Sequence, residues 1–425
     1  MNLIDRDKKH LWHPLTQHQI QTESLPIKKA KGVLLYDEDG KQYIDAIASW
    51  YTSMYGHCND YILQKVQQQM QQLDQIVFAG FTHEPAINLS ELLIEILPNN
   101  QQKLFFSDNG STANEVAIKM ALQYHYNKGN KKQTIVAFDN AFHGDTFAAM
   151  SASGLSVYNG PFADYFIDVK RISVPNENNI HKVIEQLETI LTNNRVAVFI
   201  YEPLVQGANA MHMYAAEHLD KILSVCVACN IITIADEVMT GFGKTGKNFA
   251  SDYMQIKPDI ICMSKALTAG FVPMAITSCR QKIYDAFLSD SVETAFFHAH
   301  TYTANPIACA ASIASLELLK SDEIQDNIAM IIAAHQDFNI KIKNHRAVST
   351  TRQLGVIYAI DVNINTSRYS QQRDKIFRFF MHRGICLRPL GNTIYILPPY
   401  VIKRQELNKI YDCIEEFLDQ VEIQT

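Results

Sequence analysis

The chain has 425 residues, of which 47% are hydrophobic and 19% charged, and its formal net charge is −6 at pH 7. This length allows two or three domains with sizeable cores. The modestly acidic charge gives no reason to expect binding to nucleic acid or to an anionic membrane. Five of the first nine residues are charged and this stretch has no apolar core, and no apolar run approaches membrane-spanning length, so we expect a cytoplasmic protein without a signal peptide.

Residues 1–60 are predicted to be irregular with short strands, and a helix is predicted to follow them. Residues 32–45 are typical of a β-hairpin, because Asp39-Gly40 is a strong turn signal between β-prone runs. Ser49-Trp50-Tyr51 is an aromatic cluster. Residues 61–73 keep apolar side chains at helical spacing in spite of their many glutamines, which indicates an amphipathic helix.

From about residue 84 to residue 283, predicted strands alternate with predicted helices. Such alternation favours a mostly parallel sheet with helices on both faces. The strands are expected at 103–106, 134–138, 196–201, 231–235, 259–263 and 274–278, and the helices at 85–96, 111–126, 179–191 and 215–228.

The pattern changes after about residue 312, where long helices precede a few strands. Helices are expected at 308–320, 324–343 and 404–421, and strands at 355–360 and 393–397. We interpret this part as a small α+β domain. The predicted division is therefore a segment 1–60 that packs with the C-terminal domain, a large α/β domain 61–311 and a small domain 312–425.

Two side chains with reactive groups follow strands of the predicted sheet. Asp236 follows the strand at 231–235, and Lys265 follows the strand at 259–263. Ligands bind at the carboxyl ends of strands in open α/β sheets. A lysine amine can condense with an aldehyde, and an acid can keep a pyridine nitrogen protonated, so the pair suits pyridoxal phosphate. A solvated surface lysine is the alternative that spacing alone leaves open.

A phosphate site is predicted where a strand gives way to a helix. At Gly110 the backbone can approach a ligand closely, and the Ser111 hydroxyl can donate a hydrogen bond at the helix N-terminus. An ordinary Ser or Thr N-cap explains the same residues. Phe142, after another strand, could stack on a flat cofactor or could be a core residue near a turn. Glu202 adds a carboxylate at the same end of the sheet.

Three other site types are disfavoured. A P-loop ATPase is excluded, because its pattern G-x-x-x-x-G-K-[ST], aligned on Gly243-Lys244-Thr245, requires a glycine where this chain has Val238. Cys226 and Cys229 have no second pair and no nearby histidine, so we expect no metal site there. No G-x-G-x-x-G follows a first strand, as a nicotinamide dehydrogenase would require.

Taken together, the motifs resemble those of the class III aminotransferases of pyridoxal phosphate fold type I, from about Trp12 to the C-terminus. They are Asp-Asn-Gly-Ser at 108–111, Phe-His-Gly-Asp at 142–145, Glu-Pro-Leu-Val-Gln-Gly at 202–207, Asp-Glu-Val-Met-Thr-Gly-Phe-Gly at 236–243 and Ser-Lys-Ala-Leu at 264–267. The resemblance implies a mostly parallel sheet sandwiched by helices, with a smaller α+β domain formed by the N- and C-terminal segments.

The resemblance also implies roles for single residues. Lys265 would carry the cofactor and transfer a proton, and Asp236 would pair with the pyridine nitrogen. Thr301 would reach the phosphate of the neighbouring subunit's cofactor, which makes a homodimer part of the site. The other implied cofactor contacts are Gly110, Ser111, Phe142 and Glu202. The implied substrate contacts are Trp50, Tyr51, Phe142, Lys265, Ala299, His300, Arg388 and Tyr395, with Arg388 as the clamp on a carboxylate.

Within the class, the chain is similar to the branch that serves biotin synthesis, on the stretches 11–14, 49–51, 143–146 and 387–391. That branch aminates 8-amino-7-oxononanoate to 7,8-diaminononanoate and usually takes the amine from S-adenosylmethionine. Leu15 and His300 depart from its pattern, which leaves lysine as a second donor. Another class III ω-amino acid or diamine aminotransferase, and a non-catalytic pyridoxal phosphate-binding protein, are the alternatives.

Overall fold

The computed structural model describes residues 3–20, 24–154, 156, 159–364, 366 and 371–422. Its largest sheet has seven strands in the order β4-β12-β11-β10-β7-β5-β6. Only β12 runs antiparallel to its neighbours in this sheet, so the predicted mostly parallel sheet is confirmed. The strands are β4 (Lys103–Ser107), β5 (Thr134–Phe138), β6 (Val169–Ile172), β7 (Val196–Tyr201), β10 (Ile232–Asp236), β11 (Ile260–Met263) and β12 (Ala275–Cys279).

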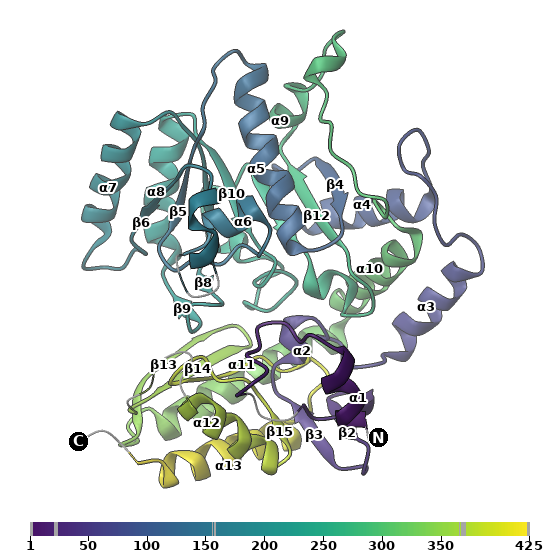
Figure 1. Cartoon of the computed structure of the whole chain (residues 1–425), viewed down its shortest axis with the longest axis vertical. Coiled ribbons are helices and arrows are strands. Elements are labelled where there is room, and N and C mark those ends of the chain that lie inside the picture. The colour runs from purple at the N-terminus through teal and green to yellow at the C-terminus, as the bar shows by residue number, and fades with distance from the viewer. Residues whose placement is uncertain are drawn as a thin grey trace.

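Helices cover both faces of this sheet because successive strand residues point to opposite sides. On β7, for example, Phe199 and Tyr201 pack in one core cluster and Ile200 packs in the other. Helix α5 (Gly110–Asn127) packs over one face and lies in front of the sheet in Figure 1. The helices in the larger cluster include α4 (Glu84–Ile96), α7 (Ile180–Asn193), α8 (Ala216–Ala228) and α10 (Pro306–Leu319).

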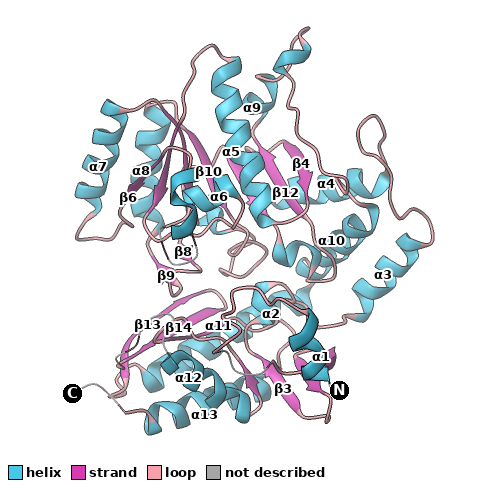
Figure 2. Ribbon diagram, in the orientation of Figure 1, coloured by secondary structure: helices cyan, strands magenta, loops and turns pink. Residues whose placement is uncertain are grey.

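A second body, below the large sheet in Figure 2, combines the two ends of the chain. Strand β3 (Gln42–Asp45) pairs in parallel with β15 (Ile385–Cys386), and this pairing joins residues more than 300 positions apart. The remaining strands here are β1 (Ile27–Lys31), β2 (Leu34–Asp37), β13 (Val348–Leu354), β14 (Ile357–Val362) and β16 (Thr393–Ile396). The helices are α1 (Leu3–His10), α2 (Ala48–Tyr51), α11 (Asp322–Ile342), α12 (Gln371–His382) and α13 (Arg404–Gln420).

Every helix and strand expected from the sequence is present, with ends within three residues of the expected ones. The hairpin β2–β3 and the helix α3 (Asp60–Met70) are among those confirmed. The description of residues 1–60 as irregular with short strands was wrong for α1 and for the turn α2. Strands β6, β13 and β15 and helix α12 were not expected. Among the described residues, no helix is long and apolar enough to cross a membrane.

Candidate active site

Asp236 ends β10, and its buried carboxylate is held on both oxygens. Oδ2 accepts a hydrogen bond from Asn114 Nδ2 at 2.8 Å and lies 2.8 Å from His143 Nδ1. Oδ1 accepts from the backbone N–H of Val238 at 3.1 Å. Because a carboxylate accepts, the network assigns the proton of His143 to Nδ1. Hydrogen bonds to a charged group contribute about 1.5–3 kcal/mol each, so the acid has a fixed orientation.

Lys265 follows β11 and begins a short 3-10 turn, Lys265–Thr268, with a left-handed φ of 53°. Desolvation lowers the pKa of its amine, and the negative charges of Asp236 and Glu202 act in the opposite direction. A lowered lysine pKa increases the neutral fraction, which is the form that attacks an aldehyde. The fold therefore brings Lys265, Asp236 and Glu202 into one electrostatic environment.

Glu202 follows β7 and ties two loops to the site. Its Oε1 accepts from the N–H of Phe142 at 2.9 Å, and its Oε2 accepts from the N–H of Gly207 at 3.0 Å. Burial raises the pKa of Glu202 to about 7, with Asp236 adding to the rise and His143 opposing it. Phe142 is 39% exposed, so it is not a buried core residue.

The turn between β4 and α5 has the shape of an anion site. Asn109, and not Ser or Thr, caps the helix: its side chain accepts from the N–H of Thr112 at 3.0 Å in a capping box. The Ser111 hydroxyl is therefore not used as the cap, and it accepts from the N–H of Asp145 at 3.3 Å. A Cβ at Gly110 would lie 2.7 Å from Cγ1 of Val238, so only glycine fits this close approach.

The expected substrate residues of the N- and C-terminal segments lie together beside Lys265. The Tyr51 hydroxyl donates to that of Tyr395 at 3.0 Å, and Lys265 Nζ lies 5.1 Å from the centre of the Tyr51 ring. The guanidinium of the exposed Arg388 lies 5.0 Å from the centre of the Trp50 ring. Burial raises the pKa of Tyr51, so its hydroxyl stays protonated at neutral pH.

The segment 298–301 contacts parts of the chain other than Lys265 and Asp236. His300 Nδ1 lies 3.2 Å from Asp108 Oδ2, beside the phosphate turn, and the Thr301 carbonyl accepts from Gln75 Nε2 at 2.8 Å. Among the described residues, neither His300 nor Thr301 makes a hydrogen bond or ion pair with Lys265 or Asp236. The same holds for Ala299. His300 alone of these three described residues adjoins the phosphate turn of its own chain, through Asp108.

Asn114 is a buried residue beside Asp236 that was not predicted from the sequence. Its Nδ2 also donates to the His143 carbonyl at 2.7 Å, so one side chain orients both Asp236 and the residue beside it. The available signal was its position in α5, one turn after Gly110, on a face otherwise filled by small apolar residues.

The residues present fit pyridoxal phosphate. The glycine cradle at Gly110 lies at a helix N-terminus, where phosphate binds. Asp236 offers a fixed carboxylate for a protonated ring nitrogen, Lys265 offers an amine for the aldehyde, and the Phe142 ring is open for stacking. The set can thus hold both ends of the cofactor and one face of its ring.

Comparison with known proteins also indicates an aminotransferase. Residues 16–418 match the family model described as Aminotransferase class-III. The chain is 41% identical to the adenosylmethionine-8-amino-7-oxononanoate aminotransferase of Synechococcus elongatus, over 97% of this chain and 99% of that protein. It is 35% identical to the Helicobacter pylori protein of the same name, over 99% and 98% of the two chains.

Solved structures agree with the sequence relatives. The crystal structure of adenosylmethionine-8-amino-7-oxononanoate aminotransferase from Methanocaldococcus jannaschii superposes with a TM-score of 0.94 at 30% identity, covering 99% of each chain. An omega transaminase from Pseudomonas jessenii in complex with PMP gives a TM-score of 0.91 at 25% identity, covering 99% of this chain and 98% of that one.

Proposed function

We propose a substrate pair for this chain, which belongs to the class III aminotransferases and takes pyridoxal phosphate as its cofactor. The chain transfers the amino group of S-adenosylmethionine to 8-amino-7-oxononanoate, giving 7,8-diaminononanoate in biotin synthesis. The observation that carries the proposal is the near full-length identity of 41% to a protein named for this reaction.

Bound pyridoxal phosphate supplies an electron sink for the substrate carbon that bears the nitrogen. The chain's own residues do the rest. Asp236 holds a proton at the ring nitrogen, with Asn114 and His143 keeping its carboxylate in place. Lys265 holds the cofactor aldehyde and, once its amine is free, moves a proton to or from that substrate carbon. The N-terminus of α5 binds the phosphate.

The wall formed by Trp50, Tyr51, Tyr395 and Arg388 suits an extended substrate with a terminal carboxylate. Arg388 is exposed beside the Trp50 ring and can accept that carboxylate through two parallel N–H groups. The Tyr51 ring lies beside Lys265 and its hydroxyl bonds to that of Tyr395, so the two rings offer apolar surface near the amine. The long apolar middle of 8-amino-7-oxononanoate matches these rings.

The amino donor separates two versions of the proposal. Absorbance of the cofactor-loaded protein is followed after mixing with S-adenosylmethionine, with lysine, or with a simple diamine, and 8-amino-7-oxononanoate is then added. We expect S-adenosylmethionine to discharge the starting absorbance and 8-amino-7-oxononanoate to restore it. If lysine and not S-adenosylmethionine discharges the starting absorbance, lysine is the amino donor. Restoration only by other keto compounds would instead favour another class III ω-aminotransferase and refute the acceptor.

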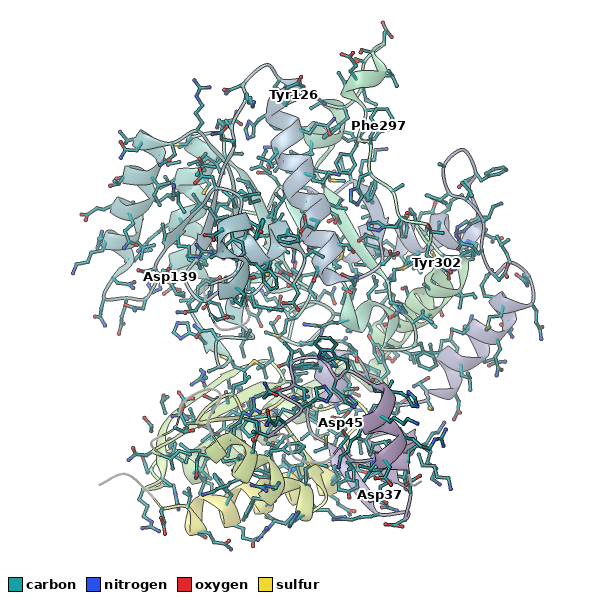
Figure 3. The ribbon with its side chains drawn as sticks, viewed as in Figure 1. Asp37, Asp45, Tyr126, Asp139, Phe297 and Tyr302 are labelled. Atoms are coloured by element: carbon teal, nitrogen blue, oxygen red, sulfur yellow. The ribbon has the colours of Figure 1, made fainter. Side chains whose placement is uncertain are left out.

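We infer that the enzyme works as a homodimer in the cytoplasm. Large apolar side chains are exposed around the segment 298–301, with Phe297 at 71% and Tyr302 at 63%, and both are labelled on the large-sheet body in Figure 3. An interface would cover them. Thr301 then approaches the partner's phosphate. Mixing Lys265→Ala with Thr301→Val chains should restore one working site per mixed dimer, whereas a monomer in ultracentrifugation would refute the shared site.

We also propose that residues 61–311 form the large domain and that residues 1–60 pack with residues 312–425. The parallel pairing of Ile44 with Ile385 supports this division.

A further inference from the structure

The short element α2 has an uncommon backbone. Four consecutive residues, none of them glycine, have left-handed φ angles: 46° at Ala48, 48° at Ser49, 69° at Trp50 and 73° at Tyr51. L-residues disfavour this region one at a time, and runs of them persist only where the surroundings impose them. The turn carries the two aromatic side chains that line the substrate wall. Whatever holds the turn therefore sets where those rings lie.

A buried acid at the end of β3 holds the turn. Asp45 is 1% exposed. Its Oδ1 accepts from the N–H of Ile47 at 3.1 Å, and its Oδ2 accepts from the N–H of Ser49 at 2.7 Å. One carboxylate thus satisfies two backbone donors at the start of the left-handed run.

His57 completes the arrangement from the far side of the turn. Its Nε2 lies 2.8 Å from Oδ2 of Asp45, the same oxygen that binds Ser49. Its backbone exchanges two hydrogen bonds with Gly32, at 2.7 and 3.0 Å, so the ring has a fixed anchor in the sheet. Asp45 therefore contacts the start of the run 48–51, and His57, which follows the run in the chain, holds Asp45.

Strand β3, which ends at Asp45, also pairs with the strand that precedes Arg388. Asp45 is paired with Cys386 in the parallel ladder of β3 and β15, and the N–H of Ala46 donates to the Cys386 carbonyl at 2.9 Å. Arg388 follows two residues later and lies over the Trp50 ring. The strand pair β3–β15, which ends at Asp45, therefore positions both the turn and the guanidinium.

We propose that the Asp45–His57 pair is a positioning device that fixes the left-handed turn and so sets the spacing of Trp50 and Tyr51 from Arg388 for a long carboxylate substrate. Neither Asp45 nor His57 touches the substrate. The identity of that substrate rests on the proposed function, whereas the holding of the turn does not.

Tryptophan fluorescence tests the turn without any turnover. The chain has two tryptophans, Trp12 and Trp50, so Trp12→Phe leaves Trp50 as the only tryptophan, which is excited selectively at wavelengths that tyrosine does not absorb. In this background Asp45→Asn and His57→Leu should lower Trp50 anisotropy and increase its quenching by acrylamide. His57→Gln, which can still donate to Asp45, should restore most of the signal. Unchanged anisotropy and quenching in both Asp45→Asn and His57→Leu would overturn the proposal.

Asp37 provides a matched control. It is also a buried acid of the same hairpin, and it accepts from the N–H groups of Asp39 and Lys41 and from the Tyr43 hydroxyl. Figure 3 shows it farther from the large-sheet body than Asp45. Asp37→Asn should leave the Trp50 signals at their unmodified values. Equal changes in Asp37→Asn would show a general loosening of the hairpin and overturn the specific role of Asp45.

Kinetics of chains that retain both tryptophans test the consequence for substrate. Asp45→Asn and His57→Leu should raise the KM for 8-amino-7-oxononanoate about tenfold or more, with a smaller change in kcat and with cofactor absorbance unchanged. A fall in kcat at constant KM would overturn the positioning role. Should the unmodified enzyme not use this acceptor, the proposed function fails, and the fluorescence results still decide the proposal about the turn.

Discussion

The buried carboxyl of Glu202 allows a quantitative test of the electrostatics at the site. Burial raises its pKa from 4.5 to about 7, so the folded chain keeps a proton there that the unfolded chain releases. The stability that this group contributes should therefore fall as pH rises from about 4.5 to about 7 and then level off. At about 1.4 kcal/mol per pKa unit, the total change is about 3 kcal/mol.

Glu202→Gln removes the titration and keeps the shape. The glutamine oxygen can still accept from the N–H of Phe142 or Gly207 but not from both, and this loss is the same at every pH. The difference in unfolding free energy between the unmodified protein and the variant should thus move by about 3 kcal/mol between pH 4 and pH 8. At about 2.1 cal/mol/K per residue, this corresponds to about 3 °C in Tm over the 425 residues.

The assay is the Tm of both proteins across this pH range, together with infrared spectra of the protonated carboxyl band. Glu188→Gln, on the exposed face of α7, is the matched control for replacing a glutamate by a glutamine. The reasoning is refuted if the Glu202→Gln difference does not change between pH 4 and pH 8. It is equally refuted if no carboxyl band that disappears in the variant is seen at pH 6.

Three further changes have expected outcomes. Lys265→Ala should abolish the absorbance of covalently held cofactor and lower turnover by at least about 10²–10⁴-fold, measured by spectroscopy and rate. Gly110→Ala should weaken cofactor binding about 10-fold or more in a fluorescence titration, because its Cβ would lie 2.7 Å from Val238, and adding Val238→Ala should restore affinity. Lys244 is fully buried and donates to the Gly241 carbonyl, and desolvation, with the charge of Lys265 adding, lowers its pKa to about 7. The unmodified protein should therefore lose stability as the pH falls from 10.5 to about 7. Lys244→Met lacks this loss, so its Tm minus that of the unmodified protein should rise as the pH falls. A Tm difference that stays constant over this range would contradict the expectation.

The large sheet could be predicted because its inner strands are uninterrupted apolar runs separated by amphipathic helices. Strand β6 escaped because Val-Lys-Arg-Ile places two long cations inside a short run at the sheet edge. Strand β15 has only two residues, and its pairing with β3 comes from tertiary contact and not from local preference. Helix α12 carries charged residues through most of its length, which hid its apolar face.

The candidate site was predictable where it depends on strand ends and not where it depends on packing between distant segments. Asp236 and Lys265 end neighbouring strands, so the chain's own order places them at one edge. Asn114 and Asp236 are 122 positions apart in the sequence, and they meet because α5 packs on the sheet. Nothing in the local sequence of α5 specifies that contact, because a single polar residue on a buried helical face has many possible partners.

The backbone of the site explains why its local conformation was invisible in the sequence. Lys265 and the run 48–51 have positive φ without being glycine, and both follow strands. Each such residue costs about 1–2 kcal/mol, so propensity alone predicts against these conformations. They persist because buried hydrogen bonds such as those of Asp45 offset the cost. A glycine would adopt these angles freely, but it would carry neither the amine nor the aromatic rings, so the strain stays where reactive side chains have to be aimed.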